Sequence, residues 1–153
     1  MTNDARDRIV ALTDKTVASL DRARPVALLL GRLAVGLLFV STGWSKVHDL
    51  AKVTSYFASL GIPAPGVNAV VVAYSELLGG AALVVGAATR LATIPLVVTM
   101  IVALLTARRE HIHGLFELVE ADELTYLVVL IMIAILGPGS IAVDHWLAKR
   151  LRR

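Results

Sequence analysis

Hydrophobic residues are concentrated in four long stretches of the chain, separated by short polar segments. A bilayer core about 30 Å thick needs roughly 20 helical residues to cross it. Because the four stretches approach that length, the pattern predicts four membrane-spanning helices. They run over about residues 25–45, 67–88, 91–107 and 123–136.

Proline and glycine mark where these predicted helices begin and end. Pro25 stands at the first position of the first span, where a proline costs no hydrogen bond. A tight turn at Thr89–Arg90 is expected between the second and third spans. The run Gly137-Pro138-Gly139 is a strong stop signal after the fourth. The connections between spans are therefore expected to be well defined.

Two segments beside the spans show amphipathic patterns. Residues 49–60 carry an apolar stripe at helical spacing, with Asp49 near the start and Gly61 at the end. We expect them to form a short helix lying on the outer membrane surface. Residues 4–21 show a weaker pattern and are expected on the cytoplasmic side. The stripe in the first segment is formed by Leu50, Val53, Phe57 and Leu60.

The composition is typical of a membrane protein and excludes functions that depend on cysteine. Of the 153 residues, 57% are hydrophobic and 18% are charged, so part of the apolar sequence must face lipid. The absence of cysteine excludes disulfide exchange, Cys-ligated iron–sulfur clusters and structural Cys zinc sites. The predicted fold is all-α, an integral membrane four-transmembrane-helix bundle with short interfacial amphipathic helices. Its parts are an N-terminal segment (1–24), a membrane domain (25–145) and a basic tail (146–153).

Lysine and arginine predict how the bundle is oriented. The N-terminal tail has five, the C-terminal tail has four, and Arg90 lies on the same side, making ten. The opposite side has four: Lys46, Lys52, Arg108 and Arg109. The positive-inside rule then places both termini in the cytoplasm of a bacterium, with the chain in its inner membrane. Basic residues clustered at the ends also favour contact with anionic lipid over nucleic-acid binding.

Two charged residues fall inside the predicted spans. A charge at the bilayer centre costs about 2.5–3.5 kcal/mol on insertion scales, so each of them needs a partner. Counted from the ends of their helices, Arg32 and Glu76 lie at depths that differ by roughly 5 Å. We therefore expect them to pair in one intramembrane polar site, with Lys46, Tyr74 and Ser75 as supporting candidates. The pair can be structural, Arg32 can instead reach the cytoplasmic headgroups, or the site can hold a substrate, quinone or proton.

The loop after the third span contains histidine and acidic residues. Glu110 and His113 stand in the Glu-x-x-His spacing that di-iron bundles use, but those bundles need the motif twice, and it occurs once here. No metal site is expected, and Glu110, His113 and Glu117 are its weak candidates. A solvated outer loop accounts for them better.

The order of several short segments resembles the DoxX family of small bacterial membrane proteins. The resemblance covers about residues 25–145 and implies a four-helix membrane protein. Some members of that family are small subunits linked to quinone-reducing sulfur oxidation or respiratory oxidases, and others are associated with oxidative-stress enzymes. The matching segments are Gly31 to Phe39, Gly43 to Lys46, Leu60 to Pro65, Glu76 to Gly80, Thr89–Arg90, His113 to Phe116, and Leu136 to Gly139 with Asp144.

These observations lead to three hypotheses for the function. The first is an accessory or anchoring subunit of a membrane redox complex, linked to quinone, respiration or oxidative stress, and not catalytic by itself. The second is a small-solute or proton carrier that uses Arg32 and Glu76. The third is a stand-alone quinone-linked oxidoreductase. No cofactor is evident, although a quinone fits the first and third hypotheses, and the expected partners are the bilayer, a redox protein and other copies of the chain.

Overall fold

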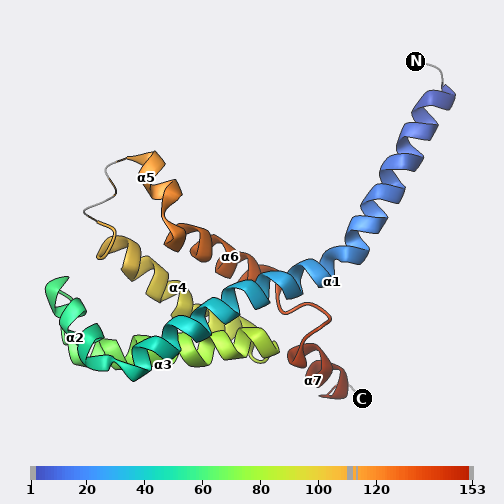
Figure 1. Cartoon of the computed structure of the whole chain (residues 1–153). Helices are drawn as coiled ribbons and strands as arrows, with labels where there is room; N and C mark the ends of the chain where they lie inside the picture. The colour runs from blue at the N-terminus through green and yellow to red at the C-terminus, as the bar shows by residue number, and fades with distance from the viewer. Residues whose placement is uncertain (1–2, 110–111, 113, 152–153) are drawn as a thin grey trace.

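The computed structural model of the chain describes residues 3–109, 112 and 114–151, and the regular elements within them are helices (Figure 1). In chain order these are α1 (Asn3–His48), α2 (Leu50–Ser59), α3 (Pro65–Val85), α4 (Thr89–Leu105), α5 (Leu115–Glu120), α6 (Asp122–Leu136) and α7 (Val143–Leu151).

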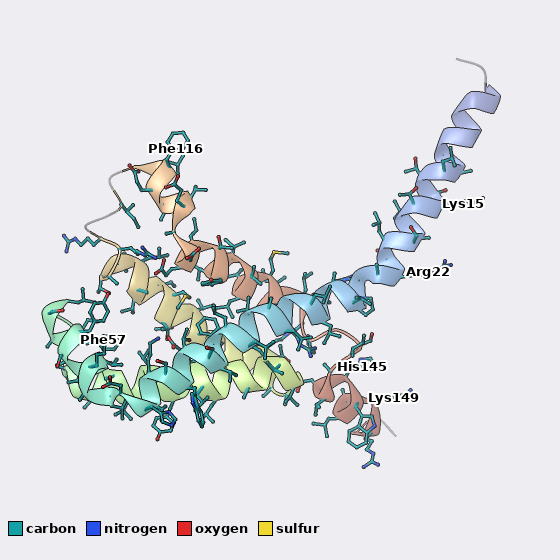
Figure 2. All side chains as sticks on the ribbon, in the orientation of Figure 1. Lys15, Arg22, Phe57, Phe116, His145 and Lys149 are labelled. Carbon is teal, nitrogen blue, oxygen red and sulfur yellow. The ribbon has the colours of Figure 1, made fainter. Side chains whose placement is uncertain are left out.

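Helix α1 joins the N-terminal amphipathic segment to the first predicted span. It runs for 46 residues with Pro25 inside it, so the prediction that a helix begins at Pro25 is wrong. A proline within a helix removes one hydrogen bond and crowds the preceding turn, which bends the helix without ending it. Figures 1 and 2 show α1 changing direction near Arg22, beyond which its N-terminal part projects away from the other helices.

Glycines bring α1 and α3 into backbone contact, and this is the most extensive helix pair in the fold. A Cβ atom added to Gly80 would lie 2.7 Å from the carbonyl oxygen of Gly36, and one added to Gly43 would lie 2.8 Å from the Cα of Leu77. Residues further along α1 meet earlier residues of α3, so the helices are antiparallel. Because no side chain separates them, these glycines fix the register between α1 and α3.

The turn between α3 and α4 lies earlier than the sequence predicted. Gly86 and Ala88 have left-handed backbones, with φ of 75° and 47°, and α4 already includes Thr89 and Arg90. The predicted turn at Thr89–Arg90 is therefore wrong by about three residues. Gly86 is the natural end of α3 because glycine adopts positive φ without strain.

Helices α4 and α6 pack on each other. Helix α4 also packs on α3, and α6 packs on part of α1, so that the four helices enclose one apolar core. Helix α6 begins and ends within a residue of the predicted fourth span, and Gly137 ends it with φ of 81°. The core side chains come from all four helices, and they are Val35, Phe39, Leu83, Leu96, Met100, Leu130 and Ile133.

Helix α2 confirms the predicted amphipathic helix after the first span. The carboxylate of Asp49 accepts a hydrogen bond from the backbone N–H of Lys52 at 3.1 Å, which caps its first turn. Gly61 follows its end with φ of 71°. The four residues of the predicted stripe are half-buried, Ser55 is exposed, and α2 packs against α3.

The outside of the helices is largely apolar, and many large hydrophobic side chains point away from the fold (Figure 2). Within the part of the chain that the structure describes, two helices are long and apolar enough to cross a membrane: α1 over Val10–His48, and α3. Helix α4 is apolar but has 17 residues, and α6 has 15. The structure thus supports two of the four predicted spans by length and composition.

Candidate functional site

Glu76 is a buried carboxylate whose partner is Lys46. Its side chain is 1% exposed, and the Lys46 ammonium donates to Oε1 at 2.5 Å and also to Oε2. Glu76 comes from the middle of α3 and Lys46 from the last turn of α1. The Lys46 side chain is 30% exposed, so the carboxylate end of the ion pair is buried and the ammonium end is partly accessible from outside the fold.

The prediction that Arg32 pairs with Glu76 is wrong. Arg32 Nε donates to the carbonyl of Leu83 at 3.0 Å, and Leu83 lies seven residues after Glu76, about 10 Å further along α3. The predicted depths were counted from the end of each helix separately. In the structure the glycine contacts fix how far α1 is shifted along α3. That register brings the C-terminal end of α1 opposite Glu76. Of the supporting candidates, Lys46 joins the site, Tyr74 is 46% exposed, and Ser75 is half-buried.

Arg32 is fully buried and binds backbone carbonyls from two separate segments. On α3 it donates to Leu83 and, at 3.5 Å, to Val84. In the α6–α7 connection it donates to Pro138 and, at 3.0 Å, to Ile141. The last carbonyls of a helix lack intrahelical partners and carry partial negative charge, which suits a guanidinium. Arg32 therefore fastens α1 to the end of α3 and to the chain leading into α7.

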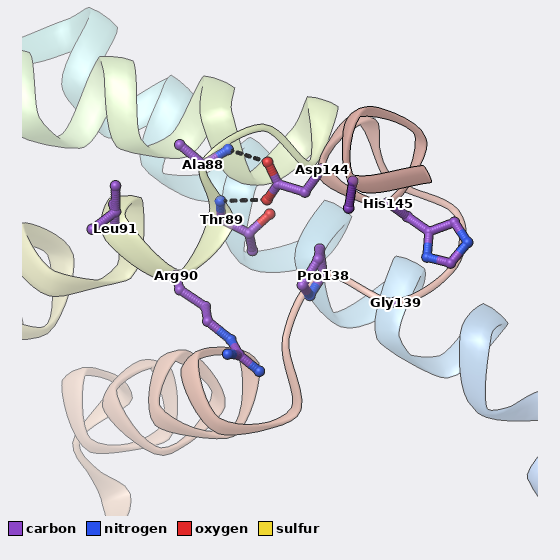
Figure 3. A pocket seen from close by; sticks show the side chains of 9 residues that line it. Ala88, Thr89, Arg90, Leu91, Pro138, Gly139, Asp144 and His145 are labelled. Carbon is purple, nitrogen blue, oxygen red and sulfur yellow. Dashed lines mark hydrogen bonds between the residues drawn. The ribbon is translucent and has the colours of Figure 1, made fainter. Parts of the chain in front are cut away.

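Asp144 of α7 caps the start of α4 across the fold (Figure 3). Its Oδ1 accepts from the N–H of Ala88 at 2.6 Å, and its Oδ2 from the N–H of Thr89 at 2.8 Å. Its own N–H donates to the carbonyl of Gly86 at 2.9 Å. Burial alone would raise the pKa of Asp144. The hydrogen bonds from Thr89 and Ala88, helped by the nearby charge of Arg32, outweigh burial and lower that pKa below its usual value.

The sequence pattern did not predict a role for Asp144, which was named only as part of the resemblance to the DoxX family. One feature of the sequence points to such a role. No Ser, Thr, Asp or Asn directly precedes the first turn of α4, so a side chain that caps the free N–H groups of this turn must come from another part of the chain. Beside this contact lies a shallow recess of about 480 Å³. It is lined by Ala88, Thr89, Arg90, Leu91, Pro138, Gly139, Asp144, His145 and Ala148.

The weak metal candidates of the loop before α5 do not form a described site. Glu110 and His113 lie outside the described residues, and Glu117 is exposed on α5. Among the residues that the structure describes, no three His, Cys, Asp or Glu side chains are grouped to hold a metal ion. Arg108 instead binds the carboxylate of Glu123, with Nε–O distances of 2.9 and 3.0 Å. That hydrogen bond and charge raise the pKa of Arg108 and tie the end of α4 to the start of α6.

Comparison with known families decides what kind of protein this is. The family model of DoxX matches residues 27–109, which span α1 beyond its bend, α2, α3 and α4. This protein belongs to the DoxX family. The matched region contains Arg32, Lys46 and Glu76, and ends before Asp144.

Curated relatives agree with that assignment. The chain is 30% identical to the inner membrane protein YqjF of Escherichia coli (strain K12), over 82% of this chain and 95% of the relative. It is also 30% identical to the inner membrane protein YphA of the same organism, over 80% and 91%. It is 28% identical to a Bacillus subtilis (strain 168) protein named "Putative oxidoreductase CatD", over 85% and 93%. No solved structure matches the chain significantly. This DoxX-family chain is thus a membrane protein, and its apolar exterior suits contact with lipid.

Proposed function

We propose that this DoxX-family protein is a multi-pass inner-membrane subunit that anchors a redox complex. In this proposal α1, α3, α4 and α6 cross the bilayer, both termini lie in the cytoplasm, and a partner protein carries the redox cofactors. A membrane quinone is the proposed electron acceptor of the complex.

One structural observation carries the anchoring role: the buried charges Arg32 and Glu76 and the half-buried Asp144 all have partners within the fold. Arg32 binds backbone carbonyls, Glu76 binds Lys46, and Asp144 binds the first amides of α4. Such charges stabilise helix contacts, while the apolar exterior is left for lipid and for membrane partners. The redox part of the proposal is supported by the name of the Bacillus subtilis relative.

Four spans are supported by the exposed apolar side chains of the two shorter helices. Ile94 and Leu105 on α4 are 59% and 68% exposed, and Ile135 on α6 is 71% exposed. At 1.5 Å per residue, α4 and α6 reach about 25 and 22 Å, which a locally thinned bilayer accommodates at modest cost.

Purification from native membranes tests this function. A tagged chain extracted in mild detergent is expected to carry a flavin-, haem- or iron–sulfur-containing oxidoreductase in roughly equal amount. The complex should reduce a soluble quinone analogue, whereas the chain purified alone should not. Quinone reduction by the isolated chain would contradict the anchoring role and favour a stand-alone oxidoreductase.

A second function, transport of protons or a small solute, is favoured by one observation. The Glu76 carboxylate is buried within a helix that is long enough to span, while its partner Lys46 is partly exposed. Buried acidic side chains within membrane spans are the groups from which proton relays are built. Proton flux into liposomes that contain the purified chain, abolished by Glu76→Gln, would support this function over the anchor.

A further inference from the structure

Helix α7 has an apolar face that the rest of the fold leaves uncovered. Val143, Trp146 and Leu147 lie on adjacent positions of the helix surface and are 37%, 53% and 45% exposed. Ile141, two residues before the start of α7, is 47% exposed. Asp144 and Ala148, together with His145, line the recess beside α4. The bundle therefore holds α7 by one face and presents its hydrophobic face outward.

The charged side chains that remain on α7 are basic. Lys149 is exposed and projects from α7 in Figure 2. The guanidinium of Arg150 lies 4.1 Å from the centre of the Trp146 ring, a cation–π contact. The acidic residue of α7, Asp144, is occupied with the amides of α4 and does not neutralise this group. Arg152 and Arg153 follow in the sequence.

We propose that α7 is an interfacial helix that binds anionic phospholipid. Val143, Trp146 and Leu147 enter the boundary between headgroups and acyl chains, and Lys149 and Arg150 bind the phosphate-bearing headgroups. An exposed tryptophan beside basic residues is the pattern that favours this boundary, because the ring is apolar and its N–H remains near water. The inference goes beyond the redox proposal and does not depend on it.

A lipid surface explains both features of α7 together. A free anion would bind the cations but leave the apolar face in water, and a neutral surface would cover the apolar face but not the cations. Anionic lipid supplies both, and each Lys or Arg near such a surface is worth about a fivefold gain in affinity.

The position of α7 gives lipid binding a structural consequence. Asp144 caps α4, and Ile141, just before α7, provides a carbonyl to Arg32. Lipid that holds α7 in place therefore also holds the start of α4 and the Arg32 contacts. Anionic lipid is expected to raise the melting temperature of the protein above that in zwitterionic lipid.

Fluorescence quenching in nanodiscs tests the proposal with the full chain. Trp44→Phe leaves Trp146 as the reporter, since the chain has two tryptophans. Increasing fractions of brominated phosphatidylglycerol in phosphatidylcholine discs should quench Trp146 at lower fractions than brominated phosphatidylcholine does. Lys149→Gln and Arg150→Gln should each weaken this preference about fivefold. Arg109→Gln, which removes an exposed charge beyond α4, is the matched control and should leave the preference unchanged.

Several results would overturn the proposal. These are equal quenching by the two brominated lipids, or an equal loss of preference in Arg109→Gln. Inorganic phosphate added to phosphatidylcholine discs at matched ionic strength should leave Trp146 emission unchanged. A response there would identify a site for free anions instead. Lys149 is exposed, so Lys149→Gln tests the lipid preference with the fold intact.

Discussion

Replacing Lys46 with methionine is expected to lower the free energy of unfolding by about 3 kcal/mol. Glu76 is 1% exposed, and without the ammonium its carboxylate is left as a buried, unpaired charge. Removing one partner of a buried ion pair costs about 3–5 kcal/mol. The lower end applies because Lys46 is itself 30% exposed and water can partly replace it. Reversible unfolding in mixed detergent micelles measures the change.

A double-mutant cycle shows whether this cost belongs to the pair. Lys46→Met combined with Glu76→Leu removes both charges, so the double variant should be more stable than Lys46→Met alone. Lys52→Met, an exposed lysine on α2, is the matched control and should stay within about 0.5 kcal/mol of the parent. Additive losses for Lys46 and Glu76 would contradict the pairing. The Arg32–Glu76 cycle, in contrast, should be additive.

The second large effect is expected from Arg32→Met, at more than about 3 kcal/mol. Hydrogen bonds to a charged group are worth about 1.5–3 kcal/mol each, and Arg32 bonds to carbonyls of both α3 and the α6–α7 connection. Methionine fills much of the volume but leaves these carbonyls without a donor. Detergent unfolding measures the loss, and Arg24→Met, an exposed arginine on the same helix, is the control.

Arg32→Lys distinguishes the geometry from the charge. A lysine ammonium is a single point, whereas the guanidinium presents donors in several directions. We expect Arg32→Lys to recover a minor part of the stability and to loosen α7, seen as faster proteolysis near Ser140. Full recovery by lysine would mean that a positive charge is enough and would contradict the role assigned to the carbonyl contacts.

Local signals predicted much of the fold. The apolar stripe with Asp49 and Gly61 gave α2, and Gly137 gave the end of α6. The prediction at Pro25 was wrong because the effect of a proline depends on the residues before it. The N-terminal segment is itself helical, so Pro25 lies inside a continuous helix and bends it. The α3–α4 turn was misplaced because Gly86 carries the positive φ there.

The pairing of the buried charges differs from the one predicted. The rule that a charge within a span requires a partner singled out Arg32 and Glu76, and Lys46 was named only as a supporting candidate, yet Glu76 pairs with Lys46. Which of them meet depends on the register of α1 against α3, set by the approach of Gly36 to Gly80 and of Gly43 to α3. No periodicity within one helix reveals that register.

Asp144 shows the same limit over a longer distance. A cap within one helix is visible in sequence because the capping residue directly precedes the first turn. Here the carboxylate lies 55 residues from Thr89 along the chain, and only the fold brings it to the amides of α4.

Labelling of single cysteines tests the central claim, a four-span bundle with both termini in the cytoplasm, most directly. The chain has no cysteine of its own, so replacements at Asn3, Ser59 and Ser140 give three clean reporters. In intact spheroplasts a membrane-impermeant thiol reagent should label the variant at Ser59 and spare those at Asn3 and Ser140 until the membrane is permeabilised. Labelling at Asn3 or Ser140 with Ser59 protected would contradict the proposed topology.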